Sequence, residues 1–265
     1  MCEINLYDSV ANNKSVYWHF RKRLYGIKLR FFEFFGTQII HSAYGVKLKA
    51  NYSDMTFRGY VKATDGGFYW EHLSRIKTPF IYLDIGANQG LYSICAGINP
   101  SCIGVVSFEP VKSTFKFLKD NLEINRLLEK SRILNVAVSS ASGLEDVFVS
   151  SVHSGGAALA SSKKDSEIDA VVEKVKLMGP DEINEVIGDK NTDIVVKIDV
   201  EGHESVVFET LRKAEFFYRI KQFFIEIDED WTDPKDLVEK LRIEGFSTLI
   251  KVGKGTHYDL LATRP

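Results

Sequence analysis

From residue 80 onward, short runs of apolar residues alternate with segments in which apolar residues recur at helical spacing. This alternation is typical of a parallel β-sheet that is covered by helices on both faces. The runs predict parallel strands over 80–85, 104–108, 132–138, 193–198 and 222–227, followed by an antiparallel pair over 246–252 and 257–263. The sequence therefore predicts an α/β fold of Rossmann-like type, with a mostly parallel sheet that ends in an antiparallel hairpin.

The connection between the third and fourth of these strands is too long to be a simple crossover. Residues 139–180 are rich in Ser, Gly and Ala and contain two further apolar runs, at 144–149 and 173–178. We interpret this segment as an inserted hairpin. Its tip, at 151–164, has little apolar surface to bury. We expect the tip to form a lid that orders when a substrate binds, and the alternative is a surface loop without a function.

The residues before the sheet differ in composition, so we divide the chain into an N-terminal extension, 1–78, and a main domain, 79–265. The first 50 residues carry eight Lys and Arg against three Asp and Glu, whereas the whole chain has a net charge of −2. Residues 15–35 predict a helix with one basic and one aromatic face, which we expect to pack on the protein's own core. Docking on a membrane surface or a protein partner is the alternative. Residues 44–70 are expected to form irregular strands and turns that flank the site.

Composition also limits the compartment and the partners. Because Lys and Arg number 34 and Asp and Glu 36, no global positive field attracts a polyanion, and we expect no nucleic-acid partner. Cys2, Cys95 and Cys102 show no CxxC spacing, which favours a reducing compartment. No apolar run approaches the roughly 18 residues that span a bilayer, and no leader-like segment begins the chain. We therefore expect a cytoplasmic protein, with membrane association through residues 15–35 as the alternative.

Two strand ends carry the features of a nucleoside site. The first strand runs into DIGANQG, residues 84–90, where glycines allow the backbone to approach a ligand and helix-start N–H groups point outward. The second strand ends at Glu109, whose carboxylate can accept hydrogen bonds from both hydroxyls of a ribose. The GxxxG spacing differs from the GxGxxG of dinucleotide-binding folds and disfavours NAD. The alternative is that Asp84 and Glu109 only cap helices.

The motifs YLDIGANQGLYS, FEP, NLEIN, KIDVEGHE and FIEI follow one another between residues 80 and 228. In this order they resemble the FkbM family of S-adenosylmethionine-dependent methyltransferases, which have the class I methyltransferase fold. The resemblance implies S-adenosyl-L-methionine as cofactor and a hydroxyl of a sugar, a glycan or a related small molecule as the methyl acceptor. It implies binding of the cofactor's methionine end by Asp84, Gly86, Asn88 and Gly90, of its ribose by Glu109, and of its adenine by the backbone at Ala137.

Transfer of a methyl group to a hydroxyl requires a base, because the pKa of such a hydroxyl lies far above 7. The fourth strand delivers Asp199, Glu201 and His203 beyond its carboxyl end, and the fifth strand delivers Glu226 beside them. We rank Asp199 and Glu226 first, then Glu201, and last His203, which the next helix begins to carry away. Asp199 and Glu226 lie on adjacent strands, where they could share a proton, bind substrate hydroxyls or hold a divalent metal. Nothing else in the sequence supports a metal.

Two other functions remain open at this point. An N-methyltransferase acting on a nucleic-acid base or a protein amide is disfavoured, because DVEG stands where such enzymes carry a [DN]PP[YF] motif. A non-catalytic binding module would use the same fold to hold a partner, through the basic and aromatic N-terminal segment.

Overall fold

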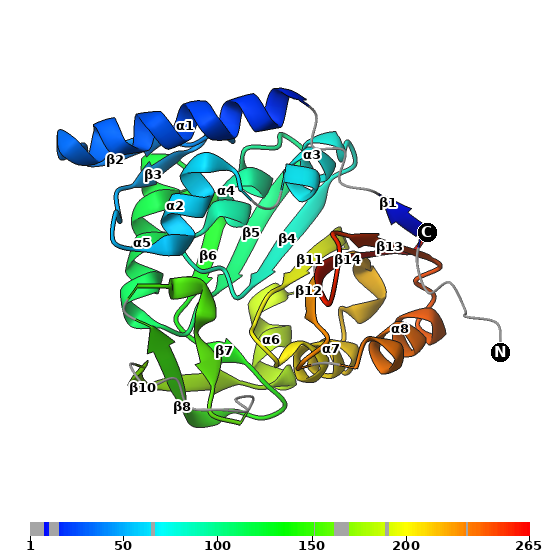
Figure 1. Cartoon of the computed structure of the whole chain (residues 1–265). Helices are drawn as coiled ribbons and strands as arrows, with labels where there is room; N and C mark the ends of the chain where they lie inside the picture. Colours follow the sequence, from blue (N-terminus) through cyan, green and yellow to red (C-terminus); the bar gives the residue numbers. More distant parts are fainter. Residues whose placement is uncertain are drawn as a thin grey trace.

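The strand β4 (Phe80–Ile85) shows why the central sheet is buried on both faces. Its side chains alternate between two apolar cores. Phe80 and Tyr82 pack with residues of the helices that precede residue 125, whereas Ile81, Leu83 and Ile85 pack with residues of the helices that follow residue 179. Figure 1 shows these two sets of helices on opposite faces of the sheet.

The computed structural model describes residues 8–10, 16–64, 67–150, 152–161, 170–188, 191–231 and 233–265. The main sheet has eight strands in the order β1-β13-β14-β12-β11-β4-β5-β6. Neighbouring strands are parallel except around β14, which is antiparallel to both β12 and β13. Besides β4, its strands are β1 (Asp8–Val10), β5 (Cys102–Phe108), β6 (Ser131–Leu134), β11 (Asp193–Ile198), β12 (Ile220–Asp228), β13 (Thr248–Val252) and β14 (His257–Thr263).

The helices connect these strands and cover the sheet. They are α1 (Val16–Phe34), α2 (Met55–Lys62), α3 (Gly67–Arg75), α4 (Leu91–Gly97), α5 (Lys112–Ile124), α6 (Pro180–Ile187), α7 (Glu204–Arg212) and α8 (Pro234–Ile243), with short 3-10 turns at Leu128–Lys130, Ser154–Gly156 and Phe217–Arg219. Within the described ranges, no helix combines the length and the apolar character that a membrane crossing requires.

The strands at 80–85 and 193–198 and the terminal antiparallel hairpin confirm the predicted fold class. The inserted hairpin is also confirmed, as β8 (Gly143–Ser150) pairs antiparallel with β10 (Ala170–Met178). Together with β7 (Ala137–Val138) and β9 (Ala158–Leu159) they form a four-stranded sheet. Of the predicted lid tip, residues 151 and 162–164 lie outside the described part of the chain.

The prediction of one strand over 132–138 is wrong. The strand β6 ends at Leu134, and β7 belongs to the sheet of the insertion. Between them, the Asn135 side chain donates hydrogen bonds to the carbonyls of Glu109 (2.9 Å) and Pro110 (2.8 Å). This amide fixes the turn in which the chain leaves one sheet for the other.

The prediction of irregular structure over 44–70 is also wrong in part. A short hairpin of β2 (Ile39–His41) and β3 (Lys47–Lys49) precedes two helices, α2 and α3. Asp54 caps α2 by accepting a hydrogen bond from the amide of Phe57 (2.7 Å). Phe57 and Val61, four residues apart, are fully buried and fix the helix on the core.

Candidate active site

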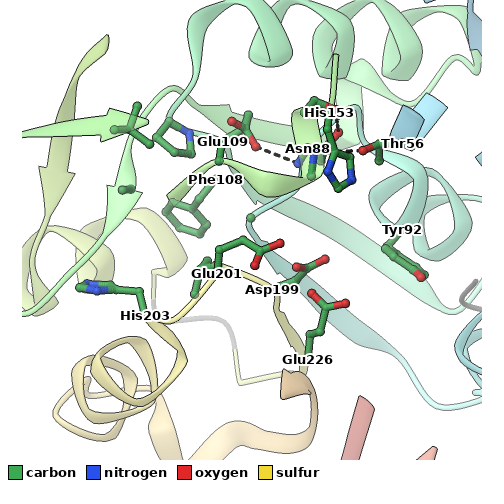
Figure 2. Close-up of a pocket in the computed structure, with 18 of the residues that line it drawn as sticks. Thr56, Asn88, Tyr92, Phe108, Glu109, His153, Asp199, Glu201, His203 and Glu226 are labelled. Atoms are coloured by element: carbon green, nitrogen blue, oxygen red, sulfur yellow. Dashed lines mark hydrogen bonds between the residues drawn. The ribbon is translucent and has the colours of Figure 1, made fainter. Parts of the chain in front are cut away.

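A cavity of about 580 Å³ opens at the carboxyl ends of β4, β5, β11 and β12. This is the edge where open α/β sheets bind their ligands, and the volume suits a small molecule. Further walls come from α2, from the insertion and from His257 at the start of β14. Figure 2 shows that Glu109 and Asn88 lie on one side of the cavity and that Asp199, Glu201 and Glu226 point toward one another on the other.

Gly86 brings the turn after β4 close to the end of β11. Its φ of +80° is a left-handed conformation, and a Cβ at this position would lie 1.8 Å from the carbonyl oxygen of Asp199. A side chain is therefore excluded by the backbone of the neighbouring strand. Gly86 and Asn88, which has a φ of +49°, both line the cavity. Both are among the residues predicted to hold the methionine end of the cofactor.

The Glu109 carboxylate is held by two backbone amides. One oxygen accepts from Asn88 N (2.9 Å) and the other from Val111 N (2.9 Å), while the residue is only 5% exposed. Burial raises its pKa to about 7, against the opposing effect of these two hydrogen bonds. The bonds fix the carboxylate at the cavity wall, where its remaining lone pairs can accept from ribose hydroxyls.

Beside Glu109 the wall is apolar. It is formed by Phe108, Pro110, Val136, Ala137, Val147 and Leu159. A slot of this kind accommodates a flat heterocycle, and the carboxylate at its edge accommodates a ribose, so these residues fit S-adenosylmethionine. We call Gly86, Asn88, Glu109 and this slot the cofactor lobe.

Two predicted cofactor residues do not line the cavity. Asp84 is fully buried, accepts a hydrogen bond from the Ser93 hydroxyl and lies 4.0 Å from the ammonium of Lys197. Gly90 precedes α4 with a φ of +86°, and a Cβ there would lie 2.6 Å from Leu118 Cδ1. Both residues therefore shape the turn from inside the protein, and their contact with the methionine end stays a prediction.

The opposite side of the cavity gathers three carboxylates. Oxygens of Asp199, Glu201 and Glu226 all lie within 4.8 Å of one another. Such spacing permits a shared proton, joint binding of substrate hydroxyls or coordination of a cation. The predicted meeting of Asp199 and Glu226 is thus present, with Glu201 beside them. We call these three residues, with Tyr60 and Tyr92 on the same wall, the acceptor lobe.

Lys197 sets the charge of Asp199. Its ammonium is 2.7 Å from Asp199 Oδ2 and 4.9 Å from the centre of the Tyr92 ring, and the residue is 4% exposed. The buried ammonium of Lys197 is therefore paired with a carboxylate. Burial acts to raise the pKa of Asp199, but the neighbouring ammonium lowers it below its usual range. The charge of Asp199, together with burial, raises the pKa of Glu226 well above its usual range. As the pH rises, Asp199 therefore loses its proton before Glu226 does.

Glu201 combines an unusual backbone with a shifted pKa. Its φ is +42°, a left-handed conformation that costs energy for a residue with a side chain. Gly202 follows with a φ of +82°, where a Cβ would lie 2.3 Å from the Trp231 ring. Burial and, after it, the charge of Asp199 raise the pKa of Glu201 to about 7. A strained turn thus places a carboxylate that titrates near neutrality inside the cavity.

The structure places His203 apart from these carboxylates (Figure 2). It borders the cavity, and its Nε2 lies 3.1 Å from the Ser139 hydroxyl. Burial lowers the pKa of its imidazole, so the neutral form is favoured.

Several residues of the cavity were not identified from the sequence. Thr56 and Tyr60 come from α2, which was predicted to be irregular. His257 reaches the acceptor lobe because β14 pairs with β12, and its Nε2 lies 3.0 Å from Glu226 Oε1. In the sequence, His257 is marked only by its place at the start of the predicted terminal strand. Its pairing with Asp228 is visible in the structure alone.

The insertion closes one wall of the cavity. The amide of Ser154 donates to Asp54 Oδ2 (2.8 Å) and its hydroxyl to Asn88 Oδ1 (3.0 Å). The amide of Gly155 donates to Thr56 Oγ1 (3.0 Å). The described part of the predicted lid therefore bonds to both the glycine-rich turn and α2.

Comparison with known proteins gives one family and several distant structures. A profile of the methyltransferase FkbM domain matches residues 84–248. No curated protein matches the chain. The METTL16 methyltransferase domain is 15% identical, with 96% of this chain and 82% of that chain covered and a TM-score of 0.49. TrmK of M. capricolum, in complex with S-adenosyl-homocysteine, is 11% identical over 74% of this chain and 66% of that chain, with a TM-score of 0.44. A human methyltransferase 10 domain containing protein is 14% identical over 74% and 80%, with a TM-score of 0.40.

Proposed function

The chain belongs to the FkbM methyltransferase family, and from this premise we propose that it methylates a hydroxyl of a sugar, a glycan or a related small molecule. The observation that carries the proposal is the cluster of Asp199, Glu201 and Glu226 in the same cavity as Glu109 and the glycine-rich turn. Carboxylates are the groups that accept hydrogen bonds from a polyol and can take the proton of one of its hydroxyls.

S-adenosylmethionine, when bound, supplies an electrophilic methyl group. Gly86 and Asn88 would hold its methionine end, Glu109 its ribose, and the apolar slot around Ala137 its adenine. The cofactor lobe orients the ligand through a backbone turn and a carboxylate that two amides already fix. Such preorganisation lowers the entropic cost of bringing two reactants together.

Within the acceptor lobe, we assign the role of base to Glu201. A base works best when its pKa lies near the working pH, and that of Glu201 is raised to about 7. Asp199 is a weaker base because the adjacent ammonium of Lys197 stabilises its ionised form. This assignment reverses the order expected from the sequence, in which Asp199 and Glu226 stood first.

The other two carboxylates would position the acceptor. Ionised Asp199 accepts a hydrogen bond from a second hydroxyl, and Glu226 in its protonated form donates one. Neighbouring hydroxyls on a sugar ring would satisfy both. The excess of carboxylates also disfavours a long polyanion as the acceptor, which supports the expectation that no nucleic acid binds here.

The test is a screen of neutral sugars, nucleotide sugars and glycans with S-adenosylmethionine labelled in its methyl group. Formation of an alkali-stable methyl ether on a neutral polyol, with a large loss of turnover in Glu201→Gln, is the expected result. Label transferred to nitrogen would overturn O-methylation in favour of an N-methyltransferase.

Calorimetry separates the enzyme from a binding module. We expect S-adenosylmethionine to bind without an acceptor and Glu109→Ala to weaken that binding. No heat of cofactor binding in the folded protein would favour a non-catalytic module. If turnover is lost with EDTA and restored by Mg²⁺, the role of the three carboxylates is to bind a cation and not to accept a proton.

A further inference from the structure

The helix α1 presents an apolar stripe that faces away from the protein. Phe20, Leu24, Ile27, Phe31, Phe34 and Phe35 are between 37% and 83% exposed. At about 100° of rotation per residue, these positions fall within an arc roughly 100° wide. Figure 1 shows α1 along the outside of the molecule.

The opposite face of α1 is already occupied. Leu29 is 3% exposed, and Tyr25 and Phe32 are partly buried in the same core as residues of α2 and α3. The sequence predicted that this helix packs on the protein's own core. This packing therefore accounts for only one side of the helix. The aromatic rings of Phe31, Phe34 and Phe35 pack on one another at the end of the exposed side.

Cationic side chains border the stripe on both sides. Arg23 and Arg30 follow one border and Lys28 lies on the other, at roughly 70° to 90° from the centre of the stripe. None of these three makes an ion pair with a residue in the described ranges. The one acidic residue of α1, Glu33, lies away from the stripe and pairs with Arg58 at 2.6 Å.

From this arrangement we propose that α1 docks the protein on a membrane surface that contains anionic lipids. The phenylalanine and aliphatic side chains enter the interface, and the flanking cations reach the headgroups. A second copy of the chain is a poor occupant, because an antiparallel or parallel pairing of the stripes brings the same cationic borders together. An anionic surface, in contrast, complements both borders at once.

The experiment is sedimentation of the full chain with vesicles of phosphatidylcholine alone or mixed with phosphatidylglycerol. We expect binding to the mixed vesicles and about a hundredfold weaker binding to the neutral ones, with further loss at high salt. Arg23→Gln/Lys28→Gln/Arg30→Gln should weaken binding to mixed vesicles about a hundredfold, at about fivefold for each charge. Phe31→Ser/Phe34→Ser should weaken it to at least the same extent.

The matched control is Tyr218→Ser/Ile243→Ser, which removes two side chains that are 67% and 74% exposed on the main domain. It should leave vesicle binding unchanged. Equal binding to neutral and anionic vesicles, or absence of binding to both, would overturn the proposal. A dimer of the wild-type chain that forms without lipid and is absent in Phe31→Ser/Phe34→Ser would also overturn the proposal. The stripe would then bind a second copy of the chain. Each variant should keep the wild-type thermal transition, since all of the changed side chains are exposed.

Discussion

The two lobes of the cavity are built in different ways. The cofactor lobe is fixed mainly by the backbone, since the amides of Asn88 and Val111 hold Glu109 and Gly86 touches the chain after β11. In the acceptor lobe, side chains hold two of the three carboxylates, because Lys197 pairs with Asp199 and His257 pairs with Glu226. A backbone cradle suits a cofactor of constant shape, whereas a side-chain cluster can change with the acceptor while the fold stays the same. We therefore expect substitutions in the first lobe to change affinity and those in the second to change turnover.

The largest effect should follow Glu201→Gln in the acceptor lobe. The amide cannot take a proton, so turnover should fall about a hundredfold to ten-thousandfold while cofactor affinity stays nearly unchanged. Steady-state kinetics and calorimetry measure the two quantities. Glu185→Gln, an exposed position on α6, is the matched control.

Asp199→Asn and Glu226→Gln complete this test. A loss of only a few-fold in Glu201→Gln, with turnover abolished in Asp199→Asn or Glu226→Gln, would return the base to the residues ranked first from the sequence. If His203→Ala alone abolishes turnover, the base lies outside the acceptor lobe. The expectation that substitutions in the acceptor lobe change turnover would then be wrong.

Glu109→Ala tests the cofactor lobe. It removes the carboxylate that we assign to the ribose hydroxyls, and loss of those hydrogen bonds should cost roughly 1.5 to 3 kcal/mol, so cofactor affinity should fall about tenfold to a hundredfold. Turnover at saturating cofactor should fall much less than in Glu201→Gln. Unchanged affinity in the folded variant, measured by calorimetry, contradicts the assignment of Glu109 to the ribose.

The pH dependence of turnover gives a smaller and graded effect. A base acts in its ionised form, and the pKa of Glu201 is raised from 4.5 to about 7. Turnover should therefore rise with pH, by about tenfold per unit below pH 7, and level off above it. If the base were a glutamate with an unperturbed pKa, the rise of turnover with pH would level off near pH 4 to 5. A profile that is flat between pH 5 and 8 at saturating substrates would exclude Glu201 as the base.

The sequence predicted the cofactor lobe better than the acceptor lobe for a physical reason. Glu109 and Gly86 sit at the ends of strands whose apolar runs mark their bounds, so position along the chain fixes position at the sheet edge. Asp84 does not follow this rule, because it is the penultimate residue of β4, where it remains inside the protein beside Ser93. Motif spacing does not distinguish a buried carboxylate from one at the cavity wall.

The acceptor lobe depends on contacts between distant segments. Tyr60 reaches it through α2, a helix of eight residues whose internal Gly59 favoured irregular structure in the sequence. His257 reaches it only through the pairing of β14 with β12. The αL turn at Glu201 has no signal in the sequence except the following glycine. These features arise from packing between elements, and the local periodicity of the sequence gives no information about such packing.

The smallest effect concerns the insertion, which bonds to the cofactor lobe and to α2. Ser154 donates to Asn88 of the cofactor lobe, whereas Gly155 donates to Thr56 on α2, the helix that also carries Tyr60 of the acceptor lobe. Thr56→Val keeps the shape of the side chain but removes the acceptor of the Gly155 amide, a loss of about 1 kcal/mol. Hydrogen exchange at that amide should become about fivefold faster, and the KM for the acceptor should rise by at most the same factor. Thr56→Ser, which keeps the hydroxyl, should behave as the wild type. If Thr56→Val instead weakens cofactor binding and leaves the KM for the acceptor unchanged, the insertion is coupled to the cofactor lobe. The contact between the insertion and α2 would then not belong to the acceptor side of the cavity.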